Sequence, residues 1–391
     1  MYRKTYAKIN LDNLKSNLNQ IMKNSDYQYY FGVVKSNCYG HGNYVIKTML
    51  ENGVNYLAVS SLDEAMLIRE DYKDVPILCL EPVHIEELEI CFKNNITIIV
   101  SDIDYFNQLI KTKHSLKVHI KIDSGMNRLG FKDKSEIKLV FDKLINKKNI
   151  ELEGIFTHFA SNGILDTLYQ NQIKKFLELT SLIDLNKIKI IHLDKSTSGF
   201  FHNKLSFCNG IRLGMIMYGY IFYPPKINSF RGKLRGLYQF LYKKKNNIVE
   251  SHNINFSLKP LLSLHTEVIS IKKVLPGESL GYYPGPVIDQ EKIIAILPIG
   301  YADGFSKKNT GRMIQINKNK YKIIGTICMN MTFVEVDKKV KVGDTVTLFG
   351  DQIRLVELTN HVGTTVYEAL ATISPLLPRV YYENNEIVKT N

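Results

Sequence analysis

The chain has 391 residues, of which 45% are hydrophobic, and its 51 basic and 38 acidic side chains give a formal net charge of +13. This composition excludes a disordered chain, and the length allows one to three packed domains. The positive charge alone favours an anionic partner, but the sequence has no nucleic-acid-recognition motif, so we expect no nucleic-acid partner.

The cysteines and the N-terminus indicate the compartment. The five cysteines form no CxxC pair and no zinc-binding spacing, so we expect free thiols and no metal site. The N-terminal segment MYRKTYAKINLDNL has no apolar signal core, and no apolar run is long enough to cross a bilayer. These features predict a cytoplasmic protein with no membrane span.

The first half of the chain alternates between short apolar segments, rich in β-branched residues, and helical patterns. Strands are predicted at residues 29–34, 54–60, 75–80, 96–100, 117–122, 151–158, 188–193 and 211–217. Helices are predicted at residues 62–70, 85–93, 135–144 and 168–183, and an S-x-x-E capping box at Ser61 and Glu64 begins the first of them. This α/β alternation of eight units predicts an N-terminal (β/α)8 barrel of the TIM type over residues 8–225.

Strand patterns dominate the second half. They lie in the segments LLSLHTEVISIKKV, KIIAILPIGYA, RMIQINKNKYKIIGTICMNMTFVEV and DTVTLFG, and one late helix is expected at about 353–373. We therefore predict a mainly-β C-terminal domain of residues 258–391 together with 1–7.

A basic linker is expected between the two domains, at residues 226–257. The segment 224–249 holds seven Lys or Arg residues and no Asp or Glu. We interpret it as a solvated insertion. The alternative is a helix that binds anions or a membrane surface through its aromatic side chains.

Polar residues follow the ends of the predicted barrel strands, where barrels of this type place their active sites. The set comprises Lys35 and Tyr39 after the first strand, Arg128 after the fifth, His158 at the sixth, Ser196 after the seventh and Arg212 in the eighth. A lysine beside cations becomes a nucleophilic amine at neutral pH, so this set fits an anionic ligand with a reactive carbonyl. Pyridoxal 5'-phosphate (PLP) offers an aldehyde and a phosphate together.

The segment VVKSNCYGHG, residues 33–42, resembles the PLP-lysine signature of the alanine racemase family. The similarity continues through KIDSGMNRLGF, HFASN, GIRLGMIMYG, PGESLGYY, PIGYADGF, GTICMNM and TISPLLPR, and so covers nearly the whole chain. The resemblance implies a PLP-dependent isomerase that interconverts L- and D-alanine and supplies D-alanine for peptidoglycan of the cell wall. It also implies a homodimer with shared active sites and a small amino acid as substrate.

The resemblance further implies a role for single residues. Lys35 would bind PLP and act as one base, and Tyr282 of the partner subunit would be the opposite base. Two bases on opposite faces allow a proton to leave one face and return to the other. Arg212 would hydrogen-bond the pyridine nitrogen, and because a guanidinium keeps its proton, the ring would stay unprotonated and act as a weaker electron sink.

The remaining implied positions hold the cofactor and the substrate. His158 would lie between Arg212 and the tyrosine base, and Lys121 aligns with a lysine that is often carbamylated in the family. The phosphate would be held by Tyr39, Ser196 and the amides of Gly214 and Met215. The substrate would be contacted by Arg128, which also meets the PLP phenolic oxygen, and by Tyr301 and Met329 of the second subunit.

Four positions depart from the family pattern. Lys195 replaces the usual asparagine before the phosphate serine, Tyr283 replaces a glycine after the base tyrosine, and Asn330 replaces a common aspartate. Pro375 stands where many members carry a tyrosine that touches the phosphate and narrows the pocket, and proline offers no hydrogen bond there. The alternative function is therefore a racemase of the same fold that acts on serine or basic amino acids.

Two other PLP proteins remain as alternatives. A PLP decarboxylase with similar domains is disfavoured by Arg212, because a decarboxylase is expected to place an acidic residue near the pyridine nitrogen. A non-catalytic PLP carrier would resemble the barrel alone, and the additional β domain with its tyrosine argues against it.

Overall fold

The computed structural model describes residues 3–161, 167–196, 198–221, 256–282 and 285–391, with a few isolated positions between 234 and 241. The chain divides into two compact units. The barrel unit comprises residues 16–35 and 46–258, and the sheet unit comprises residues 1–15, 36–45 and 259–391. The boundaries drawn from the sequence stay a prediction, and the expected basic linker lies almost wholly outside the described residues.

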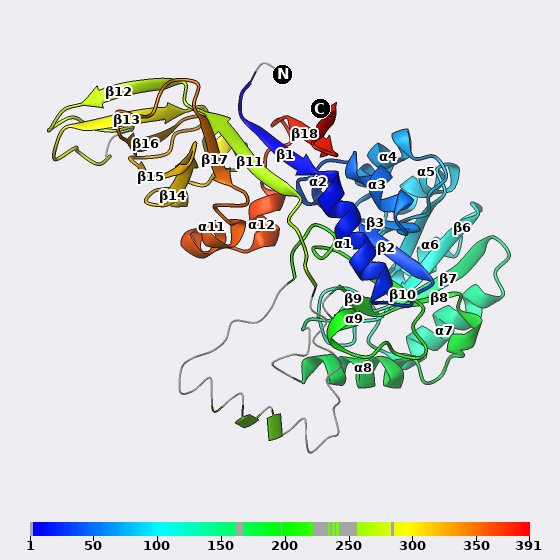
Figure 1. Ribbon diagram of the computed structural model, residues 1–391. Helices are drawn as coiled ribbons and strands as arrows, with labels where there is room; N and C mark the ends of the chain where they lie inside the picture. Colours follow the sequence, from blue (N-terminus) through cyan, green and yellow to red (C-terminus); the bar gives the residue numbers. More distant parts are fainter. Residues whose placement is uncertain are drawn as a thin grey trace. The chain divides into compact units, whose positions relative to one another are not determined.

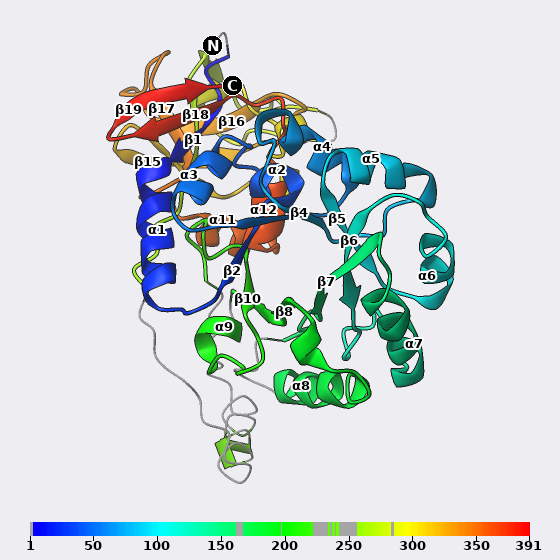
Figure 2. The ribbon, with the colours of Figure 1, turned by 90° about the vertical axis from the view of Figure 1, so that its right-hand side faces the viewer.

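The barrel unit is a closed ring of parallel strands (Figure 2). The strands are hydrogen-bonded in the order β8-β7-β6-β5-β4-β3-β2-β10-β9. Only Leu193 separates β8 from β9, so these two are halves of one strand, and the ring closes because β8 pairs with β7 and β9 pairs with β10. The strands are β2 (Tyr29–Val33), β3 (Tyr56–Val59), β4 (Ile77–Cys79), β5 (Ile96–Val100), β6 (Leu116–Lys121), β7 (Ile150–Phe156), β8 (Ile190–His192), β9 (Asp194–Lys195) and β10 (Gly210–Leu213).

Helices α4 to α8 lie outside this ring (Figure 2), which confirms the (β/α)8 class. The helices of this half of the chain are α1 (Leu11–Lys23), α3 (Val45–Glu51), α4 (Leu62–Asp71), η1 (Ile85–Glu87), α5 (Leu88–Lys93), α6 (Ile103–Leu109), α7 (Lys134–Ile145), α8 (Leu168–Leu179), η2 (Leu185–Lys187) and α9 (Ser198–Phe201). The capping box expected at α4 is half formed. The Ser61 hydroxyl accepts from the Glu64 N–H at 3.4 Å, but the Glu64 carboxylate accepts from the N–H and hydroxyl of Ser60, at 2.8 and 2.7 Å.

The sheet unit is built on one large mixed sheet (Figure 1), which confirms the mainly-β C-terminal domain. Its strand order is β12-β13-β16-β15-β14-β17-β11-β1-β18-β19, so the N-terminal strand lies between strands from the far end of the sequence. The strands are β1 (Tyr6–Asn10), β11 (Leu262–Glu267), β12 (Ser270–Val274), β13 (Lys292–Leu297), β14 (Met313–Ile316), β15 (Asn319–Ile324), β16 (Thr332–Val336), β17 (Thr345–Phe349), β18 (Arg379–Glu383) and β19 (Glu386–Thr390).

The single late helix expected at 353–373 is two helices, α11 (Leu355–Val362) and α12 (Val366–Ala371). The break lies at Gly363, whose φ of 74° and ψ of 41° are left-handed and end α11. Thr365 then caps α12 by accepting from the Glu368 N–H at 3.2 Å. The sequence predicts one helix because the apolar pattern continues across this break. The short 3₁₀ helices of this unit are η3 (Tyr301–Asp303) and η4 (Lys307–Asn309).

A left-handed turn, α2 (Lys35–Tyr39), leads from the barrel unit into the sheet unit. The φ angles are 53°, 53°, 52° and 52° at Ser36, Asn37, Cys38 and Tyr39. A left-handed helical conformation costs an L-residue about 1–2 kcal/mol, so such a turn persists only where its surroundings impose it.

Arg379 is one source of that constraint. Its Nε and Nη2 donate to the Gly40 carbonyl at 3.2 and 3.1 Å, and its Nη1 donates to the carbonyls of Ser374 and Leu377 at 2.6 and 2.7 Å. One buried guanidinium thus joins the end of the turn to the segment between α12 and β18.

His41 is the second source. Its Nδ1 lies 2.9 Å from the carbonyl oxygens of both Cys38 and Tyr39, and since both oxygens are acceptors, Nδ1 carries the proton. Burial lowers the pKa of His41 to about 4, so the ring is neutral at pH 7. The Tyr381 hydroxyl donates to the His41 carbonyl at 3.0 Å and fixes the next residue of the chain.

Two features bear on compartment and membrane contact. All five cysteines are free thiols, and four of them are buried. No helix in the described part of the chain is both long and apolar enough to cross a membrane.

Gly40 and Gly363 give a matched test of the packing around the turn. Both have left-handed φ, but a Cβ on Gly40 would lie 2.1 Å from the Leu370 carbonyl oxygen, whereas one on Gly363 would meet nothing within 4 Å. Gly363→Ala should lower the free energy of unfolding by about 1 kcal/mol, the cost of the backbone angle alone. Gly40→Ala should lower it by more than about 3 kcal/mol, because backbone must shift. Urea unfolding measures both, and equal losses would contradict the close packing of Gly40.

Candidate active site

Five polar side chains lie at the carboxyl ends of the barrel strands, as barrels of this type require for an active site. Lys35 follows β2, Lys121 ends β6, His158 follows β7, Ser196 follows β9 and Arg212 is in β10. All five belong to the barrel unit, and Arg128 is in the same unit, exposed in the turn after β6.

Arg212 is the most constrained of these groups, with only 3% of its surface exposed. Nη1 donates to His192 Nδ1 at 2.7 Å and to the His192 carbonyl. Nη2 donates to the carbonyls of Thr157 and Leu193 at 2.7 and 3.0 Å. Four of the five guanidinium N–H groups are therefore used. Within the described residues the fifth, on Nε, has no acceptor.

A chain of hydrogen bonds runs from Arg212 through the barrel interior. Because Arg212 donates to His192 Nδ1, that ring must carry its proton on Nε2, which lies 2.9 Å from His119 Nδ1. His119 must then carry its proton on Nε2, which lies 3.1 Å from Glu153 Oε2. The Tyr56 hydroxyl donates to the same oxygen at 2.8 Å. We call Arg212, His192, His119 and Glu153 the interior relay.

The charges along the interior relay follow from burial. Burial, and then the charge of Arg212, lowers the pKa of His192, and burial likewise lowers the pKa of His119, so both rings are neutral at pH 7. His192 also stacks between Phe31 and Phe156, with ring centroids 4.5 and 4.6 Å away. At the far end, burial alone would raise the pKa of Glu153, but the hydrogen bonds from His119 and Tyr56 outweigh burial and lower this pKa.

Cations crowd the mouth of the barrel near Arg212. Burial, then the charges of Arg212 and Arg128, lowers the pKa of Lys121 to about 7. Burial, and then the positive charges of Arg212 and Lys195, lowers the pKa of His158 well below its ordinary value. The mouth is therefore electropositive, and it holds one lysine that is partly a neutral amine at pH 7.

The segments after β9 and β10 form a second feature of the mouth. The Ser196 hydroxyl oxygen accepts from the Gly214 N–H at 2.8 Å, which leaves its own proton to donate. Met215 follows Gly214 and is 3% exposed. Lys195, which replaces the usual asparagine, lies beside this segment. Its Nζ donates to the Phe159 carbonyl at 2.9 Å, so its positive charge lies near the end of β7.

The other predicted site residues belong to the sheet unit. Tyr39 is buried and meets the ring of Tyr367 at 6.1 Å between centroids. Tyr282, Tyr301 and Met329 are 65%, 39% and 52% exposed. The structure thus gathers one group of predicted residues at the barrel mouth and leaves a second group exposed on the sheet unit. Tyr283, the fallback base, lies outside the described residues.

Sequence reasoning missed three residues of the interior relay, His119, Glu153 and His192. Each is a polar residue between apolar neighbours in a barrel strand, in the segments KVHIKI, ELEGIF and IIHLD. That pattern was the available signal, because a polar group buried in a strand requires a partner. The partners come from three different strands, so the sequence alone does not join them.

The donors at the mouth fit PLP. The unused Nε–H of Arg212 suits an acceptor such as a ring nitrogen, and the Ser196 hydroxyl with the amides of the segment after β10 suits a phosphate. Lys35 supplies a primary amine at the end of β2 for an aldehyde.

Comparison with known proteins agrees with this site. The family profile "Alanine racemase, N-terminal domain" matches residues 9–222, and "Alanine racemase, C-terminal domain" matches residues 261–381. The chain belongs to the alanine racemase family. It is therefore an amino-acid racemase, an enzyme of the isomerase class.

Individual relatives cover the whole chain. An alanine racemase of Staphylococcus epidermidis is 32% identical over 100% of this chain and 98% of its own length. The crystal structure of alanine racemase from Bacillus anthracis with bound L-Ala-P matches with a TM-score of 0.87 and 30% identity, covering 100% of this chain and 98% of that one. A histidine racemase of Leuconostoc mesenteroides matches with a TM-score of 0.82 at 22% identity, over 98% of this chain and 99% of that one, which shows a shared fold alone.

The lowered pKa of Lys121 gives a testable pH dependence. Between about pH 7 and 10.5 the unfolded chain holds a proton on Lys121 that the folded chain has lost, so stability rises with pH across this window. Lys121→Met removes the buried charge, so the variant should have a higher free energy of unfolding than the parent. This difference should be largest at pH 7 and should shrink by about 1.4 kcal/mol per pH unit toward pH 9, as the parent gains stability. Urea unfolding in CO2-free buffer measures the difference, and the exposed Lys318→Met is the control. A gain that is the same at every pH would contradict the lowered pKa.

Proposed function

We propose that this racemase uses PLP to interconvert L- and D-alanine, with Lys35 and Tyr282 of the partner subunit as its two bases. The observation that carries the proposal is the guanidinium of Arg212, fixed by four hydrogen bonds with its Nε–H left for a ligand. Membership of the family and the set of donors at the barrel mouth support it.

Arg212 selects the reaction through its protonation. Burial lowers the pKa of Arg212 to about 10, so the guanidinium is still charged at pH 7 and gives up no proton to a ring nitrogen. PLP, when bound, supplies a ring that accepts electron density from the α-carbon of the amino acid. With its nitrogen unprotonated, that ring withdraws less charge, which favours return of a proton at the α-carbon over other bond cleavages.

The interior relay keeps Arg212 in place. His192 can accept from Arg212 only as a neutral ring with its proton on Nε2, and the chain through His119 to Glu153 fixes that tautomer. A protonated His192 would present a second donor to the guanidinium and break the contact.

The proton transfers would use two faces of the substrate. Lys35 would remove or return the α-proton on one face, and Tyr282 of the partner subunit would do so on the other. The 65% exposed Tyr282 ring, available to meet a second chain, supports this assignment. Tyr39, Ser196 and the amides of Gly214 and Met215 would hold the phosphate.

The remaining roles complete the active site. Arg128 would contact the PLP phenolic oxygen and the substrate, and His158 would tune Arg212 and the tyrosine base. Tyr301 and Met329 of the partner subunit would reach the substrate. The protein would be a homodimer, because each site would need side chains from both subunits. It would act in the cytoplasm and supply D-alanine for peptidoglycan. The second candidate substrates are serine and basic amino acids, which Pro375 favours because it narrows the pocket less than a tyrosine.

Racemisation of four amino acids by the PLP-loaded protein tests the function. L-Alanine should be turned over at least about tenfold faster than L-serine, L-lysine or L-arginine, since selection by pocket size is worth about 1–3 kcal/mol. Chiral chromatography measures the products, and Lys35→Ala should be inactive and lack the absorbance of the lysine–PLP adduct. If serine or a basic amino acid is turned over faster, that amino acid and not alanine is the substrate. If none of the four amino acids is racemised, the proposal is contradicted.

Tyr282→Phe separates the two bases. The ring is kept but its ionisable hydroxyl is lost, so proton transfer on that face should fall by a factor of about 10²–10⁴. Exchange of the α-hydrogen with solvent deuterium should therefore drop strongly for one enantiomer of alanine and much less for the other. Unchanged exchange for both enantiomers would move the second base to another residue, with Tyr283 as the next candidate.

A further inference from the structure

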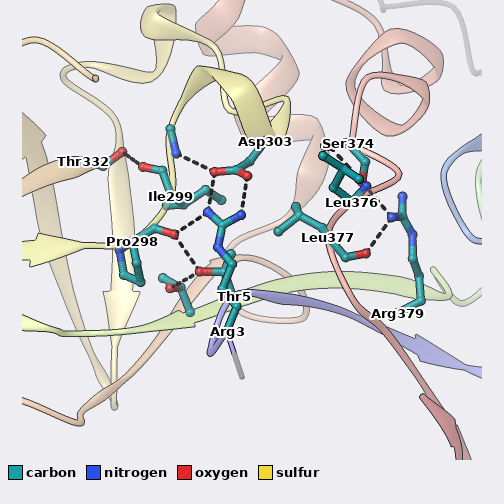
Figure 3. Close-up of polar contacts among 12 residues, drawn as sticks. Arg3, Thr5, Pro298, Ile299, Asp303, Thr332, Ser374, Leu376, Leu377 and Arg379 are labelled. Atoms are coloured by element: carbon teal, nitrogen blue, oxygen red, sulfur yellow. Dashed lines mark hydrogen bonds and ion pairs between the residues drawn. The ribbon is translucent and has the colours of Figure 1, made fainter. Parts of the chain in front are cut away.

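The turn of residues 298–303, which carries Tyr301, is joined to the N-terminal segment by an ion pair (Figure 3). Nη1 and Nη2 of Arg3 donate to the two carboxylate oxygens of Asp303, at 2.6 and 2.7 Å. The Asp303 side chain is 5% exposed and the Arg3 side chain 33%. Two parallel hydrogen bonds between planar groups fix orientation as well as distance, which a single lysine contact does not.

The same two side chains also hold the start of the turn. Asp303 Oδ2 accepts from the Gly300 N–H at 3.0 Å, and Arg3 Nη2 donates to the Pro298 carbonyl at 2.7 Å. The Thr5 hydroxyl donates to that carbonyl at 2.8 Å (Figure 3). Both ends of the turn, at 298–300 and at 303, are therefore attached to the segment that leads into β1.

The turn is joined in addition to the loop that carries Met329. The Tyr301 N–H donates to the Cys328 carbonyl at 3.1 Å, and the Ala302 N–H donates to the Met329 carbonyl at 3.0 Å. Tyr301 and Met329 thus lie on two adjacent backbone segments that are hydrogen-bonded to each other, with their side chains 39% and 52% exposed. Displacement of the turn displaces both side chains together.

We propose that Arg3 and Asp303 are a positioning pair that sets the place of Tyr301 and Met329 and so acts on substrate binding in the partner subunit's active site. This rests on the proposed function, which assigns Tyr301 and Met329 to the site of the other subunit. Arg3 has no role in the proton transfers. Its effect reaches them through the backbone of the turn.

Arg3→Gln tests the pair in the PLP-loaded dimer. Without the fork, the turn keeps only the Thr5 contact to the N-terminal segment, so Tyr301 and Met329 are held less firmly. The KM for L-alanine should then rise by about tenfold or more, since a small misplacement of binding groups costs that much. The absorbance of the lysine–PLP adduct should not change, because Lys35 belongs to the barrel unit. Arg3→Lys keeps the charge without the fork and should give an intermediate KM. If Arg3→Gln does not fold, Arg3→Lys carries the test in the same direction.

Hybrid dimers assign the effect to one site. In a dimer of an Arg3→Gln chain with a Lys35→Ala chain, the one competent barrel receives an intact turn from its partner, so its KM should equal that of the parent. In a dimer of a parent chain with a chain carrying both substitutions, the one competent barrel receives the altered turn, so its KM should be raised. Equal or reversed KM values would overturn the proposal.

A control separates this proposal from the proposed function. A hybrid of the parent chain with Lys35→Ala should show half the activity per dimer at an unchanged KM. If the parent does not racemise or this hybrid is inactive, the proposed function has failed. If both behave as expected and Arg3→Gln leaves the KM unchanged, only the positioning pair has failed.

Discussion

The charge of Arg212, buried at the end of β10, is the constraint on which the barrel interior depends. An ion out of water costs several kcal/mol unless its hydrogen bonds are satisfied, and three backbone carbonyls with His192 satisfy four N–H groups here. That geometry requires a neutral His192, then a neutral His119, and finally a carboxylate at Glu153. A layer of the interior that is usually filled by branched aliphatic side chains is therefore polar and aromatic, and the Arg212 guanidinium is held rigidly within it.

A second constraint acts at Lys35, where the chain leaves the barrel unit. The strand before it belongs to the barrel, while the left-handed turn after it belongs to the sheet unit. Arg379 and His41 stabilise that turn against its backbone strain. Both units must therefore be folded before the backbone on either side of the lysine is fixed.

Much of the fold was predictable because local patterns reflect it. The eight barrel strands appear as apolar segments that end at polar residues, and β2 and β5 were placed within one residue of their observed ends. The break at Gly363 was missed, since the apolar period continues through it. Residues 1–7 were assigned to the β domain, but the strand β1 itself was not predicted because its partners, β11 and β18, lie at the other end of the chain. Pairing over such a distance leaves no local signal.

The sequence by itself determined the barrel and the family, and it predicts the reactive groups, since strand ends and long motifs can be read locally. It did not reveal the interior relay, in which His192, His119 and Glu153 come from three strands and become partners only when the ring closes. Nor did it reveal the ion pair of Arg3 and Asp303, two residues that are separated by 300 positions in the chain. Tertiary structure decided these contacts because burial makes a hydrogen bond obligatory for each polar group, and only the fold determines which partner is within reach.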